Sequence, residues 1–245
     1  MAEEEDDGLI LAVPSKGRLE EETRRVFGDS RLPITRPGGA RSYSGAIKNQ
    51  PGVSVRFYPA AEIARGLIMG AVDIGVTGSD LIYETAENGE GKVVMVKPLN
   101  FGQADVVVAV PDAWIDVTHM VDLADVASDF RLRHGRWLRV ATKYVHLTRK
   151  FFSDWGIAEY RIVESAGATE AAPAAGAADL IVDITSSGAT LQANALRVLE
   201  DGLVMKSEAP LIISRTAKWT PLKKAQLEAL LSIMGGVAPG ISTKL

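Results

Sequence analysis

The sequence predicts an α/β fold with two domains, because strand-like apolar runs alternate with helical patterns along its 245 residues. Residues 9–13 and 104–110 read as buried strands of two different sheets. The first and last segments both look like parts of one sheet. We therefore expect a discontinuous first domain, 1–103 plus 196–245, around a continuous second domain, 104–195, with a ligand cleft between them.

The other elements follow the same alternation. Further strands are expected at 53–58, 92–99, 157–164, 180–184, 199–205 and 211–214. Helices are expected at 19–27, 60–69, 122–127, 142–155 and 221–234, and the alanine-rich stretch 165–178 also favours a helix.

The composition is that of a globular protein, with 47% hydrophobic and 24% charged residues. The formal net charge is −4, but the acids at 3–7 alone supply −5, so the rest of the chain is near +1. This balance argues against nucleic-acid binding, and the arginines of 131–139 are expected on a solvated loop. The absence of cysteine excludes disulfides and thiolate catalysis, and the three histidines lack metal-site spacing.

The ends of the chain carry no targeting pattern. The N-terminus is acidic where a signal peptide would be basic, and residues 9–13 are too short for its apolar core. No apolar run approaches the ~20 residues of a membrane-spanning helix. We therefore expect a cytoplasmic protein with no membrane partner.

Two loops of the first domain carry basic residues where a phosphate group could bind. Lys16, Gly17 and Arg18 follow the first strand and precede a helix, at the expected carboxyl edge of the sheet. Arg41 and Tyr43 lie in the Gly- and Pro-rich segment 33–51, a candidate hairpin flap. Exposed lysines and arginines more often serve solubility alone, so these loops are weak signals by themselves.

A third loop of the first domain follows the strand near residue 74. The turn Gly78-Ser79-Asp80 places Asp80 at the start of the next helix. This carboxylate either lines the same cleft or caps the helix.

The strongest pattern lies in residues 170–191, where a strand enters a hydroxyl-rich loop and then a helix that starts at 190 or 191. The loop is Thr185, Ser186, Ser187, Gly188, Ala189 and Thr190. Amides at a helix start, hydroxyls and one glycine together form a typical phosphate cradle. Asp183, at the carboxyl end of the strand, is suited to sugar hydroxyls or to Mg²⁺. The alternative is an ordinary helix cap.

This pattern resembles the signature of the ATP phosphoribosyltransferase family at every position. The matching residues are Glu170, Gly176, Ala178, Ile181, Asp183, Ile184, Ser187, Gly188, Thr190 and Leu191. Segments 14–19, 73–81 and 141–144 also resemble family segments in the same order, so the resemblance covers about 9–214.

The resemblance implies transfer of the phosphoribosyl group of PRPP (5-phosphoribosyl 1-diphosphate) to N1 of ATP, with release of pyrophosphate, in histidine biosynthesis. It implies that residues 185–190 bind the 5-phosphate of PRPP, and that Asp183 and Glu170 contact the ribose or Mg²⁺, directly or indirectly. Lys16, Arg18 and Arg56 would neutralise pyrophosphate or ATP phosphates. The catalytic candidates are thus Asp183, Glu170 and Arg56.

The remaining first-domain residues are assigned to ATP and pyrophosphate. Asp80 is expected in the ATP half of the cleft beside Lys16 and Gly17, and Arg41 and Tyr43 are expected on the flap.

The length resembles that of the short form of the family, because only 31 residues follow Ser214 and a C-terminal regulatory domain needs more. The short form implies a regulatory subunit similar to histidyl-tRNA synthetase, with catalytic homodimers inside a hetero-oligomer.

Two other functions fit parts of the pattern. Type II solute-binding proteins share the expected two-lobed, periplasmic-binding-protein-like fold, and such a module would bind a small anion without turnover. Salvage phosphoribosyltransferases usually carry two adjacent acids before their Thr-Gly loop, whereas here Val182 precedes Asp183.

Overall fold

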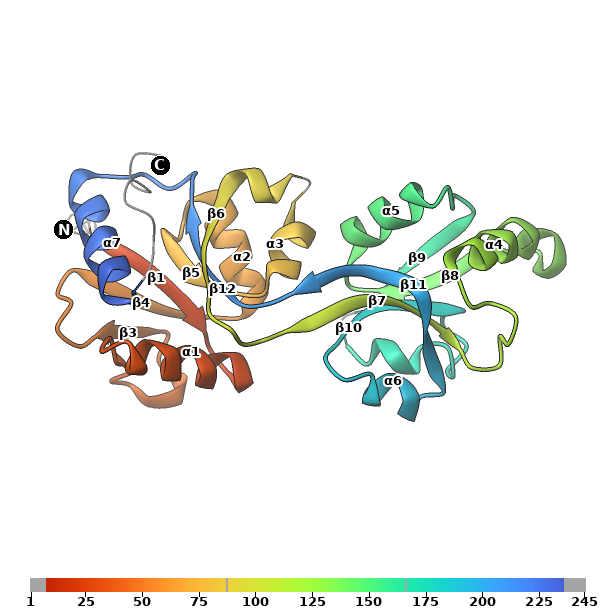
Figure 1. Cartoon of the computed structure of the whole chain (residues 1–245), viewed down its shortest axis with the longest axis horizontal. Coiled ribbons are helices and arrows are strands. Elements are labelled where there is room, and N and C mark those ends of the chain that lie inside the picture. The colour runs from red at the N-terminus through yellow and green to blue at the C-terminus, as the bar shows by residue number, and fades with distance from the viewer. Residues whose placement is uncertain (1–7, 87, 166, 236–245) are drawn as a thin grey trace. The chain divides into compact units, whose positions relative to one another are not determined.

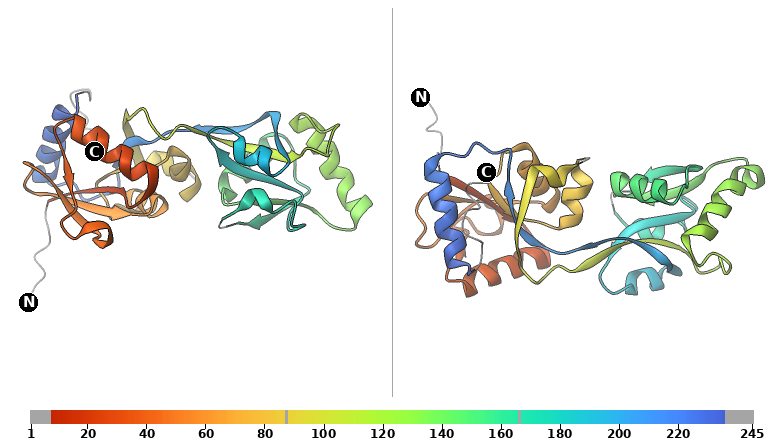
Figure 2. Two further views of the ribbon diagram at one scale, coloured as in Figure 1. Left: turned by 90° about the horizontal axis from the view of Figure 1, so that it is seen from below. Right: turned by 45° about the horizontal axis from the view of Figure 1, so that its top comes forward.

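A computed structural model describes residues 8–86, 88–165 and 167–235, which divide into two compact units. The first unit consists of two stretches of chain, one that runs up to Gly102 and one that begins at Glu208, and the second unit is Gln103–Ser207. Each unit is built on a mixed β-sheet with helices on its faces (Figure 1, Figure 2), which confirms the predicted α/β class. No helix in these described ranges has the length and apolarity that crossing a membrane requires.

The described part of the first unit forms a sheet with the strand order β2-β3-β4-β1-β5-β12-β6. Its elements are β1 (Leu9–Pro14), α1 (Gly17–Asp29), β2 (Ile34–Thr35), the 3₁₀ helix η1 (Gly39–Arg41), β3 (Ser44–Ile47), β4 (Val53–Tyr58), α2 (Ala60–Met69), β5 (Ile74–Val76), α3 (Ser79–Thr85), η2 (Gly89–Lys92), β6 (Val93–Pro98), β12 (Pro210–Ser214) and α7 (Pro221–Ile233).

Helices cover both faces of this sheet because its central strand β1 is apolar on both sides. Leu9, Leu11 and Val13 pack against α1 and α7, whereas the neighbouring alanine of β1 faces α2 and α3. The helix α7 is also tied to the sheet by a buried ion pair, in which Lys223 Nζ lies 2.9 Å from the carboxylate of Asp73. Since β4 and β5 both pair with β1 in parallel, the carboxyl ends of these three strands share one edge.

The described part of the second unit forms a sheet with the strand order β11-β7-β10-β8-β9. Its elements are β7 (Ala104–Pro111), α4 (Met120–His134), β8 (Leu138–Thr142), α5 (Val145–Asp154), β9 (Tyr160–Glu164), η3 (Thr169–Ala171), β10 (Leu180–Thr185), α6 (Ala189–Ala193) and β11 (Leu196–Ser207).

Alternation along β7 gives the second sheet two buried faces. Val106, Val108 and Val110 pack against α4 and α5, whereas Val107 and Ala109 face the side covered by α6. Figure 1 shows the same division, with α4 and α5 on one side of the sheet and α6 on the other.

The boundary between the units falls at a different place from the sequence-based domains. Residues 196–207, which the sequence assigned to the first domain, form β11 in the second unit. They pair antiparallel with β7 from Leu196 opposite Pro111 to Ser207 opposite Ala104. Because of this pairing, the chain belongs to the second sheet up to Ser207 and enters the first unit at Glu208.

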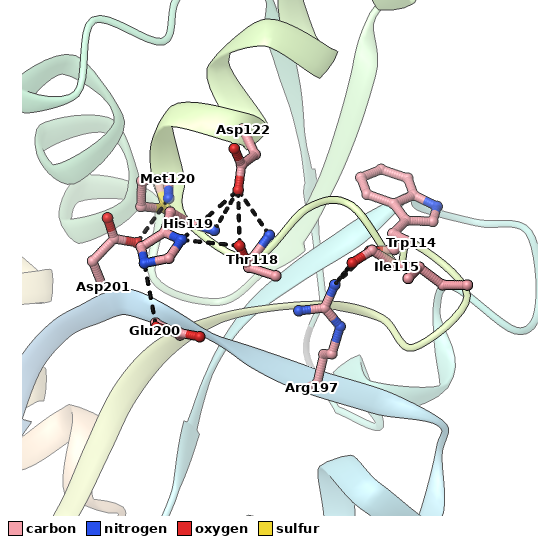
Figure 3. A network of polar contacts seen from close by, with 9 residues as sticks. All are labelled: Trp114, Ile115, Thr118, His119, Met120, Asp122, Arg197, Glu200 and Asp201. Atoms are coloured by element: carbon pink, nitrogen blue, oxygen red, sulfur yellow. Dashed lines mark hydrogen bonds and ion pairs between the residues drawn. The ribbon is translucent and has the colours of Figure 1, made fainter.

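A polar network fastens α4 to β11 within the second unit (Figure 3). The N–H of Met120 donates to Asp201 Oδ1 at 2.7 Å, and His119 Nε2 lies 3.3 Å from Glu200 Oε2. Asp122 closes the first turn by accepting the N–H of His119 at 2.8 Å. This backbone hydrogen bond lowers the pKa of Asp122. The helix therefore begins at a position that β11 fixes.

One helix prediction was wrong, and one helix was predicted correctly but too short. The alanine-rich segment forms only η3 and turns, because Pro173 has no N–H to continue a helix and Gly176 adopts φ +67°. The predicted helix at 122–127 is α4, which is longer because Leu123, Ala127 and Phe130 continue its buried face. The first arginines of 131–139 therefore lie in the last turn of α4 and not in a loop.

The aspartate at the start of β10 joins three segments of the second unit. Asp179 accepts from both terminal nitrogens of Arg136, at 2.6 and 2.8 Å, and from the N–H of Arg139 at 2.8 Å. Burial raises the pKa of Asp179, but hydrogen bonds from Arg136 and then Arg139 outweigh it and lower that pKa from 3.8 to about 2.

We predict that Asp179→Asn lowers the free energy of unfolding at pH 7 by on the order of 2 kcal/mol. Because the folded-state pKa lies below the unfolded one, this stabilisation is complete above about pH 4 and is lost as the pH falls toward about 2. Urea unfolding of both proteins across this range measures it, with Asp154→Asn as the exposed control. A difference that does not change with pH would contradict the prediction.

Candidate active site

The predicted PRPP residues lie where two parallel strands of the second unit end. β8 and β10 pair in register from Leu180 opposite Val140 to Val182 opposite Thr142. Their carboxyl ends therefore lie side by side, which brings Lys143, directly after β8, close to Asp183 in the last residues of β10.

A small pocket of about 160 Å³ opens at this edge. Its lining residues are Glu170, Asp183, Ile184, Thr185, Ser186, Ser187, Thr190 and Leu191. Six of these were named from the sequence as ribose, metal or phosphate contacts. Gly188 and Ala189 belong to the same loop but do not line the pocket. The pocket thus brings together Glu170 and Asp183, which are 13 positions apart in sequence, because η3 places Glu170 beside the end of β10.

The loop itself is held by its own hydroxyls. Thr185 Oγ1 accepts the N–H of Gly188 at 2.9 Å, and Ser187 Oγ accepts the N–H of Ala189 at 3.4 Å. Gly188 has φ +73°, a conformation in which a side chain is strained. The helix α6 starts directly after Gly188, at Ala189, whereas the sequence predicted a start at 190 or 191.

Asp183 is the only one of these residues with a charged partner within this part of the described chain. Its Oδ1 accepts the N–H of Ile184 at 2.8 Å and lies 3.6 Å from Lys143 Nζ. The side chain of Asp183 is 16% exposed and that of Lys143 is 46% exposed. The lysine therefore compensates a largely buried carboxylate and still reaches solvent. The sequence did not predict the pairing of Lys143 with Asp183, because the register that brings them together is a tertiary property.

The basic residues of the first unit follow β1. Lys16, Gly17 and Arg18 are exposed at the start of α1, and Gly17 has φ +75°. The loop is tied to the end of the neighbouring strand, because the N–H of Ser15 donates to the carbonyl of Tyr58 at 2.9 Å.

The other predicted residues of the first unit come from three elements. Arg41 ends η1, and Tyr43 follows it with 68% exposure, in a loop joining β2 to β3. Arg56 lies on β4, where its Nη1 donates to Ser44 Oγ at 3.2 Å. Asp80 is 5% exposed in the first turn of α3. The parallel pairing of β1 with β5 puts α3 at the same edge as the Lys16 loop. The hairpin expected between β2 and β3 is present.

The described residues contain no cluster of three or more His, Cys, Asp or Glu side chains that could hold a metal ion. Asp183 and Glu170 remain as a pair of carboxylates on one pocket. Such a pair fits Mg²⁺, which usually binds to one or two protein carboxylates and takes its other ligands from substrate phosphates and water.

A family model described as HisG, ATP phosphoribosyltransferase, matches residues 59–236. The chain belongs to the ATP phosphoribosyltransferase family. An ATP phosphoribosyltransferase of Afipia carboxidovorans is 53% identical over 223 residues, which are 91% of this chain and 69% of that protein. The chain is accordingly a glycosyltransferase of histidine biosynthesis that transfers a phosphoribosyl group to ATP. The alternative of a non-catalytic solute-binding module is not supported.

Two solved structures confirm the predicted fold type. The ATP phosphoribosyl transferase (HisG:HisZ) complex from Thermotoga maritima aligns with a TM-score of 0.70 and 24% identity, over 92% of this chain and 95% of that one. The amino-acid-binding protein ArtJ from Geobacillus stearothermophilus aligns with a TM-score of 0.51 and 12% identity, over 97% and 93%. The fold is thus similar to that of periplasmic binding proteins. The chain spans between 65% and 69% of the length of the curated relatives that it matches.

We predict that Thr185 fixes the loop conformation through its hydroxyl. Thr185→Val, which keeps the shape but removes the acceptor for the N–H of Gly188, should speed hydrogen exchange of the Gly188 amide by roughly fivefold, as the loss of about 1 kcal/mol implies. Thr185→Ser keeps the acceptor and serves as the matched control. Equal exchange in all three proteins would contradict the prediction.

Proposed function

We propose that the pocket beside β10 binds the ribose 5-phosphate half of PRPP, with the loop 185–190 on the phosphate and Asp183 and Glu170 on the ribose hydroxyls. The observation that supports this assignment is that both acids and the loop hydroxyls line a single pocket. The dipole of the peptide units and the hydroxyl donors favour an anion there, while the carboxylates favour neutral hydroxyl donors.

The chemistry requires positioning more than covalent catalysis. N1 of ATP is a weak, neutral nucleophile, and the C1 carbon of PRPP becomes cation-like as pyrophosphate leaves. An enzyme therefore gains most by aligning N1 with C1 and by stabilising the negative charge that develops on pyrophosphate. We assign the second task to the cations Lys16, Arg18 and Arg56.

The first unit would then hold ATP and pyrophosphate. Lys16, Gly17 and Arg18 are exposed directly after β1, as a phosphate contact requires. Arg41 and Tyr43 sit on a neighbouring loop with exposed side chains, and Asp80 lies at the same sheet edge.

Metal dependence belongs to the same proposal. We assign Mg²⁺ to Asp183 and Glu170, which would hold it directly or through water while it neutralises PRPP oxygens. The two carboxylates also orient the ribose without the metal, so that their role in PRPP binding is measurable apart from turnover.

We further propose that the chain works as a homodimer within a cytoplasmic hetero-oligomer. The regulatory partner would be a subunit similar to histidyl-tRNA synthetase. The support for this proposal is that the similar Thermotoga maritima structure is a HisG:HisZ complex.

An ultraviolet assay of N1-phosphoribosyl-ATP formation, with and without such a subunit, tests the reaction and the partner together. Product formation supports the reaction, and stimulation or histidine sensitivity only with the added subunit supports the partner. A chain that forms no product under either condition would overturn the reaction proposal.

We predict that Asp183→Asn and Ser187→Ala each raise the KM for PRPP by about 10- to 100-fold, since each removes a hydrogen bond to a charged or ribose group worth about 1.5–3 kcal/mol. The matched controls are Asp154→Asn and Ser153→Ala, both exposed in the same unit. Steady-state kinetics measure the change, and circular dichroism checks the fold. Unchanged PRPP kinetics in both site variants would reject the assignment of the pocket.

A further inference from the structure

Arg36, to which the sequence assigned no role, forms several hydrogen bonds near the edge at which β1 and β4 end. The side chain of Arg36 is 6% exposed. Its Nε donates to the carbonyl of Ser42 at 2.7 Å, and its Nη1 donates to the carbonyl of Ser15 at 3.2 Å. The same Nη1 lies 3.2 Å from Glu20 Oε1. The guanidinium carbon stacks 4.1 Å from the ring centroid of the buried Phe57.

These contacts join two segments that are distant in sequence, the β2–β3 loop that contains Arg36 and the chain around the start of α1. Ser15 precedes the exposed Lys16 loop after β1, and Glu20 belongs to the first turns of α1. Ser42 stands between Arg41 and Tyr43 in the β2–β3 loop. Each of the two loops is also anchored once to β4, because Tyr58 accepts the N–H of Ser15 and Tyr43 accepts the N–H of Phe57. Among the described residues, Arg36 is the side chain whose hydrogen bonds link the two loops to each other.

The chemistry of this position requires an arginine. A planar guanidinium directs its N–H groups to separate acceptors while one face lies on an aromatic ring. A lysine would carry the same charge but could not hold both carbonyls and the ring contact in one geometry. Removal of the side chain would take this donor from the carbonyls of Ser15 and Ser42 and would leave Arg24 as the cation beside Glu20.

We propose that Arg36 is a positioning residue for the nucleotide-phosphate site. It fixes the loop that carries Arg41 and Tyr43 relative to the loop that carries Lys16 and Arg18, so that both loops present their cations to one ligand. The inference rests on the proposed function, since that function assigns the two loops to ATP and pyrophosphate. It adds a residue that touches no ligand and acts through those that do.

A neighbouring arginine separates this role from general stabilisation of the fold. Arg24 Nη1 lies 3.5 Å from the same Glu20 carboxylate, and its Nη2 donates to the carbonyl of Ile34 at 3.4 Å. Neither of these contacts of Arg24 reaches Ser15 or Ser42. Arg24→Met therefore removes an arginine from the same cluster and leaves the link between the loops intact.

The experiment is a double-mutant cycle between Arg36→Met and Arg41→Ala, with Arg24→Met as the control. If Arg36 acts through Arg41, Arg36→Met alone lowers kcat/KM for ATP by on the order of 10²-fold, as a displacement of about 1 Å does. In the Arg41→Ala background the same change costs less than about threefold, because the group that it positions is already gone. Arg24→Met leaves kcat/KM within about threefold.

Additive losses in the cycle, or an equal loss in Arg24→Met, would overturn the inference, because a purely structural role moves all three variants alike. Should Arg36→Met fail to fold, Arg36→Lys replaces it in the cycle with the same expected non-additivity. Calorimetric binding of ATP without PRPP is measured on the same proteins. Weaker ATP binding in Arg36→Met than in Arg24→Met supports the inference even if no product forms, and equal binding overturns it, so that its failure is distinct from a failure of the proposed reaction.

Discussion

The parallel pairing of strands decides where the functional residues of this protein can meet. In the second unit, the register of β8 against β10 places Lys143 beside Asp183, and in the first unit β4 and β5 flank β1 in the same direction. Parallel strands end at one edge, so residues from segments far apart in sequence collect there without long loops. The helices that bury both sheet faces are what make this pairing stable.

We propose that the two edges hold anions by different means. The second unit uses a short loop of hydroxyls and amides. A hydrogen bond to Thr185 holds this loop together, Gly188 adopts a positive φ within it, and Lys143 lies beside the carboxylate of Asp183. The first unit uses exposed side-chain cations on loops that Arg36 links. A sugar-phosphate carries neutral hydroxyls that need carboxylates, whereas a departing pyrophosphate carries charge that needs cations, so the two sets of residues suit the two halves of one reaction.

Features encoded locally were predictable from the sequence. The strand, loop and helix of residues 180–193 follow one another without interruption, so their pattern predicts both the elements and most of the pocket lining. The contacts of Lys143 and Arg36 depend on register and on chain reversal, which a linear pattern does not contain. The prediction of a helix in the alanine-rich segment was wrong because the high helix propensity of alanine does not outweigh the interruptions at Pro173 and Gly176. The strand β11 was assigned to the wrong domain because its pairing with β7 joins residues far apart in sequence.

The strand β12 lies between β5 and β6 in the first sheet, although it follows the whole second unit in sequence. Phe101 and Ala209, which border that unit on its two sides, are joined by a backbone hydrogen bond of 3.1 Å. On the ribosome, therefore, the second unit has emerged completely while the first sheet still lacks an interior strand. Newly made chains should pass through a stage in which β5 and β6 await their shared neighbour, and during that interval these two strand edges are open to pairing with other chains.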